Sequence, residues 1–212
     1  MLRKAVGRGF KSLRVRYMIL KQFLAGSIKN YVYVIAEEKS KQAAVIDPTE
    51  VEGVLDFLAK NKLKLVYIFN THSHYDHTAG NSQLRKMGGK VVAYKSGDIA
   101  VREGSMLKLG SIEIKILHTP GHTQDSICIL AENNLFTGDT LFVEECGRTD
   151  LPGGSSEQMY ESLERLKRLP GSIKIHPGHL YGGSCSTIAR EKANNYCLAD
   201  RNKEEFVKFM RD

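Results

Sequence analysis

Residues 71–77 read Thr-His-Ser-His-Tyr-Asp-His, which places three of the seven histidines and one carboxylate within a short run. Imidazole and carboxylate groups bind divalent metal ions well, and such a dense group is costly to bury unless something binds it. His72 and His74 are two residues apart, so in extended geometry both side chains project to the same side and can reach one metal ion. Asp76 and His77 follow a bend and can point to a neighbouring position. The run therefore predicts a metal site.

Three further side chains farther along the chain have the right chemistry to complete this site. His122 and His179 each follow a Pro-Gly pair, and Asp139 ends the apolar segment 135–139. Proline fixes one turn and glycine permits a conformation that other residues avoid, so each imidazole can be aimed inward from a tight loop. Two metal ions about 3.5–4 Å apart can share an oxygen, and a carboxylate such as Asp139 is suited to bridging them. We therefore predict two divalent ions: zinc, or else iron or manganese.

The remaining histidines are expected to lie outside the metal site. His118 and His176 carry neither the dense spacing of the 71–77 run nor a preceding Pro-Gly pair. A single histidine is more often a satisfied core or surface residue than a ligand.

The elements that must position these residues follow from hydrophobic patterning. The continuous apolar run 63–69 predicts a strand buried on both faces, and the histidine run follows its carboxyl end, where open α/β sheets usually carry their sites. We predict further strands at 18–24, 31–36, 43–46, 91–94, 111–117, 126–131, 135–137 and 172–175. We predict helices capped at Thr49 and over 78–87, 155–169, 186–198 and 203–210. Two halves that each contain strands and helices predict a layered α/β sandwich, with two sheets face to face and helices outside.

Length and composition indicate one ordinary globular unit. The 212 residues are enough for one substantial domain, which we place at 18–212, and no apolar run is long enough to cross a bilayer. The four cysteines form no Cys-x-x-Cys pair, so neither a disulfide framework nor a cysteine zinc site is indicated. We expect a reducing, cytoplasmic location and no membrane partner.

The net charge of +7 is concentrated at the start of the chain. Residues 1–17 contain six basic residues and no acid, which leaves 25 basic against 24 acidic residues in the remainder. The nearly neutral body argues against a nucleic-acid partner. The basic segment 1–17 has three interpretations: a targeting peptide, a contact for an acidic surface, or a plain extension before Met18. We predict the plain N-terminal extension.

The motifs as a set resemble those of a known family. Residues 71–77 match the His-x-His-x-Asp-His motif of the metallo-β-lactamase superfamily, and segments 118–123, 137–140 and 177–179 match its later motifs in order. The resemblance spans about residues 18–200. It implies an αββα sandwich with the site at one edge of the two sheets.

The resemblance also implies how the ligands are divided. The first metal ion would be held by His72, His74 and His122. The second would be held by Asp76, His77 and His179, and Asp139 would bridge the two.

Within the superfamily the chain looks most like the glyoxalase II and persulfide dioxygenase branch. The motif at 146–150, Cys-Gly-Arg-Thr-Asp, carries this likeness together with Tyr181. In glyoxalase II relatives a basic residue at the place of Arg148 and a tyrosine at the place of Tyr181 contact glutathione. A further aromatic residue contacts glutathione in that family, but Asp150 occupies its position in this chain, so that contact is missing. About thirty residues follow His179, so we expect a small hydrolase without the helical C-terminal domain of glyoxalase II.

The leading functional prediction is a binuclear metal hydrolase, a thioesterase of the hydroxyacylglutathione hydrolase type that uses a metal-bridging hydroxide. Metal ions lower the pKa of a shared water, which can then attack a carbonyl carbon. Asp76 and Asp139 would orient this nucleophile as well as hold metal. Arg148 would grip the anionic end of a small thioester or thiol-derived substrate, or else form a salt bridge with Asp150.

Other classes remain open alternatives. A persulfide dioxygenase would use His72, His122 and Asp139 around one iron. A nuclease or lactonase would use the same metal-binding core, but the nearly neutral charge of the chain after residue 17 argues against a nucleic-acid substrate. A binding module without catalysis is disfavoured by the complete ligand set. The sequence leaves the oligomeric state open.

Overall fold

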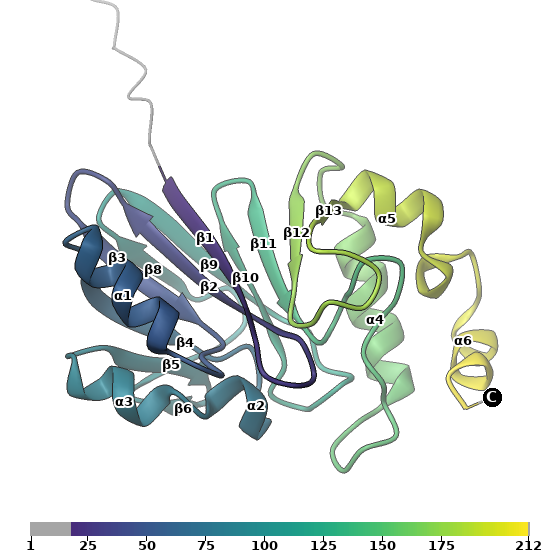
Figure 1. The fold of residues 1–212 in the computed structure, drawn as a ribbon. Helices are drawn as coiled ribbons and strands as arrows, with labels where there is room; N and C mark the ends of the chain where they lie inside the picture. Colours follow the sequence, from purple (N-terminus) through teal and green to yellow (C-terminus); the bar gives the residue numbers. More distant parts are fainter. Residues whose placement is uncertain (1–17, 212) are drawn as a thin grey trace, which may run out of the picture.

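The computed structural model describes residues 18–211, so the basic segment 1–17 lies outside the described residues. Two six-stranded sheets face each other, and helices cover both outer faces (Figure 1). This arrangement confirms the predicted αββα sandwich. Within residues 18–211 no helix is both long enough and apolar enough to span a membrane.

The first sheet is built from the first half of the chain. Its strands, in spatial order, are β1 (Met18–Ala25), β2 (Asn30–Glu37), β3 (Gln42–Ile46), β4 (Lys64–Phe69), β5 (Lys90–Tyr94) and β7 (Ile99–Val101). A short strand, β6 (Ser96–Gly97), lies between β5 and β7 in the chain. Three helices belong to this half: α1 (Glu52–Lys60), α2 (Tyr75–Thr78) and α3 (Asn81–Lys86).

The second sheet is built from the second half of the chain. Its strands are β8 (Met106–Leu109), β9 (Ile112–His118), β10 (Ile127–Ala131), β11 (Asn134–Gly138), β12 (Lys174–Pro177) and β13 (Ser186–Thr187). The helices of this half are α4 (Ser156–Lys167), α5 (Ile188–Asn194), the 3₁₀ helix η1 (Tyr196–Leu198) and α6 (Lys203–Phe209).

Three apolar layers hold the sandwich together, and β2 shows how the sequence builds two of them. Tyr33 and Ile35 join the core between the two sheets, together with Phe69 and Phe136. The alternate residues of β2, such as Val34, join the layer beneath α1 and α3. Because successive strand residues point to opposite faces, a continuous apolar strand fits between two layers. The third layer lies between the second sheet and α4 to α6.

Two predicted helices differ from those observed because tertiary contacts override the local pattern. The helix predicted from Thr49 begins at Glu52, and Thr49 Oγ1 instead donates to the carbonyl of Asp76. The helix predicted over 78–87 begins only at Asn81, as α3, and a separate turn, α2, precedes it. The two are divided at Gly80, whose amide donates to the Pro48 carbonyl at 2.7 Å. A Cβ at Gly80 would collide with the Val51 side chain. The α2 turn is thereby fixed against the segment that follows β3.

The end of the chain also departs from prediction. The helix predicted over 186–198 is replaced by the short strand β13, then α5 and η1. The helix predicted over 155–169 is confirmed as α4, whose first turn is capped by Ser155 Oγ accepting from the Gln158 amide at 3.2 Å.

Candidate metal centre

The metal-ligand candidates lie at one edge of the sandwich, where the carboxyl ends of several strands meet. His72 and His74 follow β4, and α2 carries Asp76 and His77. The second sheet contributes His122 from the β9–β10 connection, Asp139 after β11 and His179 after β12. The two halves are joined at this edge by backbone hydrogen bonds, from the Ile127 amide to the Thr71 carbonyl at 2.8 Å and from Tyr31 to Gly178 at 2.7 Å. All seven predicted ligands are therefore brought together.

Glycines allow the two halves to approach closely enough. Gly138 has φ of +49°, and a Cβ there would collide with the side chain of Thr71. A Cβ at Gly178 would collide with Oδ1 of Asp139. Only a residue without a side chain fits at either place, so Asp139 and His179 can lie directly against the histidine run.

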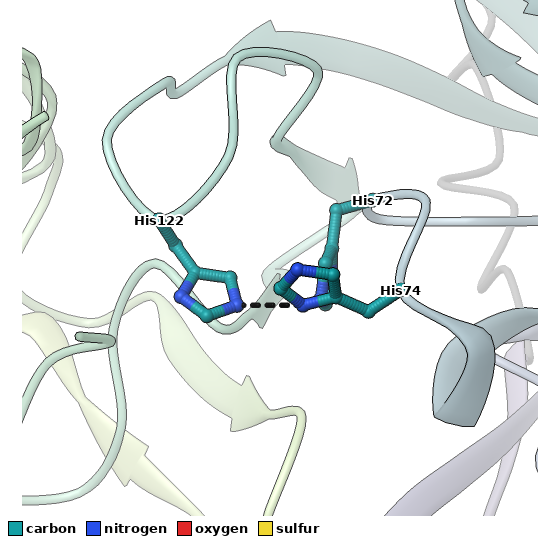
Figure 2. Close-up of side chains that lie close together, drawn as sticks. All are labelled: His72, His74 and His122. Atoms are coloured by element: carbon teal, nitrogen blue, oxygen red, sulfur yellow. Dashed lines mark hydrogen bonds between the residues drawn. The ribbon is translucent and has the colours of Figure 1, made fainter. Parts of the chain in front are cut away.

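The first ligand group consists of three imidazoles (Figure 2). His74 Nδ1 lies 3.0 Å from His72 Nε2 and also 3.0 Å from His122 Nε2. His72 and His122 are buried, whereas His74 is partly exposed. This group opens to solvent on the side of His74.

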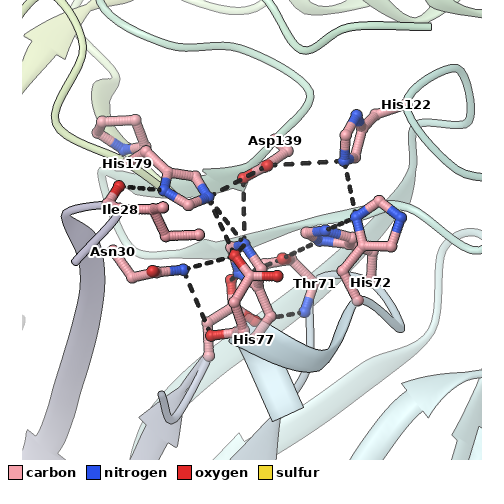
Figure 3. Close-up of polar contacts among 12 residues, drawn as sticks. Ile28, Asn30, Thr71, His72, His77, His122, Asp139 and His179 are labelled. Carbon is pink, nitrogen blue, oxygen red and sulfur yellow. Dashed lines mark hydrogen bonds and ion pairs between the residues drawn. The ribbon is translucent and has the colours of Figure 1, made fainter. Parts of the chain in front are cut away.

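The second ligand group combines imidazoles and carboxylates (Figure 3). His77 Nε2 lies 3.3 Å from Asp76 Oδ2 and 3.2 Å from His179 Nε2, and the His179–Asp76 separation is 3.4 Å. The edge of a tetrahedron with metal–ligand bonds of 2.0–2.1 Å is about 3.4 Å. These three donors are therefore spaced as a tetrahedral metal ion requires.

Asp139 lies between the two groups. Its Oδ1 is 3.4 Å from His77 Nε2, and its Oδ2 is 3.4 Å from His179 Nε2 and 3.6 Å from His122 Nε2. The buried Oδ1 atom has no hydrogen-bond partner among residues 18–211. A buried carboxylate oxygen without a donor is costly. This oxygen, with the nitrogen donors around it, fits a pair of divalent cations.

Hydrogen bonds behind the ligands define the imidazole tautomers. His122 Nδ1 lies 2.8 Å from the carbonyl of Arg148, and His179 Nδ1 lies 3.1 Å from the carbonyl of Ile28. A carbonyl oxygen only accepts, so each Nδ1 donates, and each Nε2 is the nitrogen that faces the ligand group.

Asp47 supports two more ligands, and the sequence reasoning did not identify it. Its carboxylate accepts from the Thr71 amide at 2.7 Å and from Thr71 Oγ1 at 2.6 Å, and it lies 3.0 Å from His77 Nδ1. Because the single Thr71 hydroxyl proton goes to Asp47, Thr71 Oγ1 accepts from His72 Nδ1 at 3.1 Å. Asp47 has φ of +51°, which is uncommon for a residue other than glycine. Its place at the end of the apolar segment 43–46 was the available signal.

The electrostatics of the site keep two imidazoles neutral and two carboxylates ionised. Burial lowers the pKa of His72 and His74, so both are neutral at ordinary pH. Burial opposes ionisation of Asp76, but hydrogen bonds from His179 and His77 hold its pKa well below the usual range. Burial likewise opposes ionisation of Asp139, but the charge of His77 and the hydrogen bond from His179 keep its pKa low. The site thus offers neutral imidazoles at His72 and His74 and ionised carboxylates at Asp76 and Asp139. Burial opposes protonation of His77 and His179, but the surrounding carboxylates outweigh it and raise the pKa of both.

Arg148 and Tyr181 lie beside the ligands. Both line a cavity of about 270 Å³ that also contacts His122 and Asp139. Tyr181 is exposed and stacks on the His179 ring, with centroids 5.4 Å apart and planes at 13°. Arg148 Nε and Nη2 both donate to the Asp150 carboxylate, at 2.6 and 2.5 Å. A larger cavity of about 590 Å³ lies between β1 and α1 and touches none of the ligands.

The two histidines predicted to lie outside the ligand groups do so. His118 stacks on Tyr94 with ring centroids 3.9 Å apart, and its Nε2 donates to the Gln124 carbonyl. His176 packs on Phe136 and lies 2.9 Å from Asn134 Oδ1.

Comparison with known proteins agrees with this geometry. The metallo-beta-lactamase superfamily model matches residues 28–110 and 102–179. The chain is 37% identical over 189 residues to a hydroxyacylglutathione hydrolase of Pelagibacter ubique, covering 84% of this chain and 75% of that protein. A hydroxyacylglutathione hydrolase of Francisella tularensis is 38% identical over 172 residues, covering 77% and 68%.

Solved structures give the same result. ETHE1 from Myxococcus xanthus superposes with a TM-score of 0.88 at 37% identity, covering 92% of this chain and 91% of that one. TTHA1623 in a di-iron-bound form gives 0.73 at 25% identity, covering 83% and 98%. Together, the matched motifs, the fold and these relatives confirm the predicted branch, and the chain belongs to the metallo-beta-lactamase superfamily.

Proposed function

We propose that this protein is a metal-dependent hydrolase of the glyoxalase II type, which cleaves the thioester of an S-acylated small thiol. The observation that carries this proposal is the meeting of two complete ligand groups at Asp139, beside a cavity that holds Arg148 and Tyr181. The relatives named hydroxyacylglutathione hydrolase support the same reaction.

The ligand groups suit two divalent ions, for which zinc is our first choice and iron or manganese are alternatives. His72, His74 and His122 would hold one ion, and Asp76, His77 and His179 the other, with Asp139 between them. When bound, the ions supply Lewis acidity, which makes water acidic enough to act as a nucleophile near neutral pH and polarises a carbonyl.

The two aspartates would orient the attacking nucleophile. Asn30 Nδ2 donates to Asp76 Oδ2 at 2.8 Å and fixes its carboxylate. The Asp76 side chain is 29% exposed, against 10% for Asp139. Asp76 therefore has more room to contact an entering water or substrate, and its low pKa keeps it ionised as a hydrogen-bond acceptor. A thiolate leaving group needs little help from a general acid.

Arg148 and Tyr181 would bind the thiol portion of the substrate. The Tyr181 ring offers an apolar wall next to His179, and T-shaped packing against Phe142, with centroids 4.7 Å apart, holds it in place. The Arg148 guanidinium is exposed. It can bind a substrate carboxylate if it releases the Asp150 carboxylate or binds both carboxylates at once.

The Arg148→Gln and Asp150→Asn variants separate substrate binding from loop stabilisation. If Arg148 binds a carboxylate, Arg148→Gln raises KM about tenfold with little change in kcat, because uniform binding energy is lost. Asp150→Asn should leave KM unchanged or lower it, since it frees the guanidinium. Equal effects of both variants on steady-state kinetics would show that the pair only stabilises the loop.

The direct test of the reaction is hydrolysis of S-lactoylglutathione and simpler acyl thiols by the metal-loaded protein. Thiol release should be readily measured for the natural chain and fall at least a hundredfold in His72→Ala. His118→Ala is the matched control, because His118 lies outside both ligand groups, and it should retain activity. Turnover no faster than that of His72→Ala, across all acyl thiols, would remove the proposal.

A persulfide dioxygenase is the second candidate, and the similarity to ETHE1 over 91% of that chain favours it. This reaction would use His72, His122 and Asp139 around one iron. Oxygen uptake with glutathione persulfide, measured beside elemental analysis, distinguishes the two. One iron per chain with oxygen uptake supports the dioxygenase, whereas two metal ions with thioester turnover support the hydrolase.

A further inference from the structure

Next to the cavity of the metal centre, which Cys146 also lines, three sulfur-containing side chains meet at a second, smaller cavity. Cys146 and Cys197 are nearly buried, with 6% and 5% of their surfaces exposed. The two thiols are close enough for each to shift the pKa of the other, and Cys146 Sγ lies 3.8 Å from Met210 Sδ. All three residues line a cavity of about 200 Å³. A small polar molecule can therefore reach sulfurs that the proposed hydrolase reaction does not use.

The backbone holds Cys146 in a fixed position. Cys146 pairs with Leu141 in an isolated antiparallel bridge, and the Phe142 amide donates to the Glu145 carbonyl at 2.9 Å. The turn between them is closed at Glu144, which has φ of +64°. Cys146 thus sits at the end of a tight hairpin rather than on a loose loop.

The same hairpin is tied to Cys197 by one buried amide. Asn195 Oδ1 accepts from the Cys197 amide at 2.9 Å, and Asn195 Nδ2 donates to the Glu145 carbonyl at 3.0 Å. The fully buried Glu191 carboxylate completes the connection, because it accepts from Asn195 Nδ2 at 2.8 Å and from the Glu144 amide at 2.7 Å. The proximity of the two thiols is therefore imposed by their neighbours and does not depend on a bond between the sulfurs.

We propose that Cys146 and Cys197 form a redox-reactive dithiol, which a hydroperoxide oxidises to an intramolecular disulfide. The Cys197 thiolate attacks the terminal oxygen of the hydroperoxide, the O–O bond breaks, and a sulfenic acid forms. The other oxygen takes up a proton and leaves as an alcohol, or as water when the oxidant is hydrogen peroxide. The Cys146 sulfur then attacks the sulfenic sulfur, the S–O bond breaks, and water leaves. One peroxide takes two electrons from the sulfurs, and two thiols become one disulfide.

The effect of each thiol on the pKa of the other agrees with this order of attack. The neighbouring Cys146 thiol lowers the pKa of Cys197, whereas the Cys197 thiol and burial raise the pKa of Cys146. The thiolate is the reactive form of cysteine, so Cys197 attacks first and Cys146 resolves.

The other two cysteines provide matched controls. Cys128 is fully buried, its Sγ lies 3.3 Å from Thr119 Oγ1, and burial raises its pKa to about 11. Cys185 is exposed, and its Sγ contacts the Ser186 carbonyl. Cys128 is thus a buried thiol that solvent does not reach, and Cys185 is an exposed thiol that serves as the accessible control.

The test is to map the disulfide in the full chain after treatment with hydrogen peroxide. Free thiols are alkylated, and the protein is digested with trypsin and a glutamate-specific protease, since cleavage after Glu145 separates Cys146 from Cys128. We expect a peptide pair that joins Cys146 to Cys197, has lost two hydrogen atoms and disappears on reduction with dithiothreitol. The pair should persist in Cys185→Ser and be absent from Cys197→Ser.

Alkylation of Cys146 and Cys197 at peroxide concentrations that already oxidise Cys185 would overturn the proposal. A disulfide that appears only in urea would also overturn it, because the folded geometry would then play no part. The mapping in the natural chain decides the matter even if Cys197→Ser fails to fold. Since the readout is a peptide mass, it does not depend on hydrolase activity or on metal content.

Discussion

At the scale of single residues, Asp47 shows how one buried carboxylate orients two metal-ligand candidates. It contacts His77 directly and His72 through the Thr71 hydroxyl. Groups behind metal ligands fix ring orientation and raise ligand basicity. Asp47 is thus expected to matter for the metal site although it binds no metal itself.

Replacement of Asp47 by asparagine should therefore weaken metal binding about 10–100-fold, the usual effect of losing such a partner. Competition with a chromogenic chelator measures the affinity. Asp98→Asn is the control, because Asp98 also accepts a hydrogen bond from a backbone amide, that of Val91 at 2.8 Å, but belongs to none of the ligand groups. An equal loss of affinity in both variants would show a general effect on folding instead.

Metal affinity should also depend on pH. In the absence of metal, burial lowers the pKa of His179, but the Asp139 and Asp76 carboxylates outweigh it and raise this pKa to about 9. A proton therefore competes with metal for His179 at all pH values below this, and metal binding must release it. The carboxylates also raise the pKa of His77 against the effect of its burial, so we expect zinc affinity to fall by at least about tenfold per unit as pH decreases from 8 to 6. Affinity that is constant over this range in chelator competition would contradict the assignment.

At the scale of elements, the turn after β11 sets the position of Asp139. Gly138→Ala should destabilise the fold by about 2–4 kcal/mol, because left-handed strain adds to a collision with Thr71. Gly104→Ala is the matched control: Gly104 has φ of +74° but open space around it, so only about 1–2 kcal/mol is expected. Urea denaturation measures both. Equal losses would show that the contact with Thr71 contributes nothing.

The elements and ligands that could be predicted from the sequence are those whose signal is local. The strand before His72 was evident from its apolar run. The histidines and aspartates could be predicted as metal ligands because their side chains bind divalent ions. Asp47 could not be identified, because an aspartate before a proline is also a common turn residue. The division at Gly80 could not be foreseen either, since its cause is contact with Val51, a residue distant in sequence.

At the scale of the whole molecule, neither sheet contains a complete metal site. The first half supplies His72, His74, Asp76 and His77, whereas the second supplies the other three ligands. A metal ion that binds both halves binds the folded state better than the unfolded chain. Binding should then stabilise the fold as mass action requires, by about 2.7 kcal/mol at a free metal concentration a hundredfold above Kd.

Thermal unfolding with zinc and with excess chelator tests this coupling. The midpoint should rise by several degrees with zinc in the natural chain. His179→Ala should lose most of the shift, and His118→Ala should keep it. An unfolding midpoint that does not change with zinc would show that the ligand candidates of the two halves do not bind zinc together.

The order of the ligands along the chain bears on how the enzyme acquires its ions in the cell. Four donors lie within residues 72–77, but His179 is more than a hundred positions later. A nascent chain leaving the ribosome thus exposes an incomplete set of metal-ligand candidates long before β12 is synthesised. If these residues bind the proposed ions, full occupancy would have to wait for the second sheet, so complete metal loading would be a late event in biogenesis.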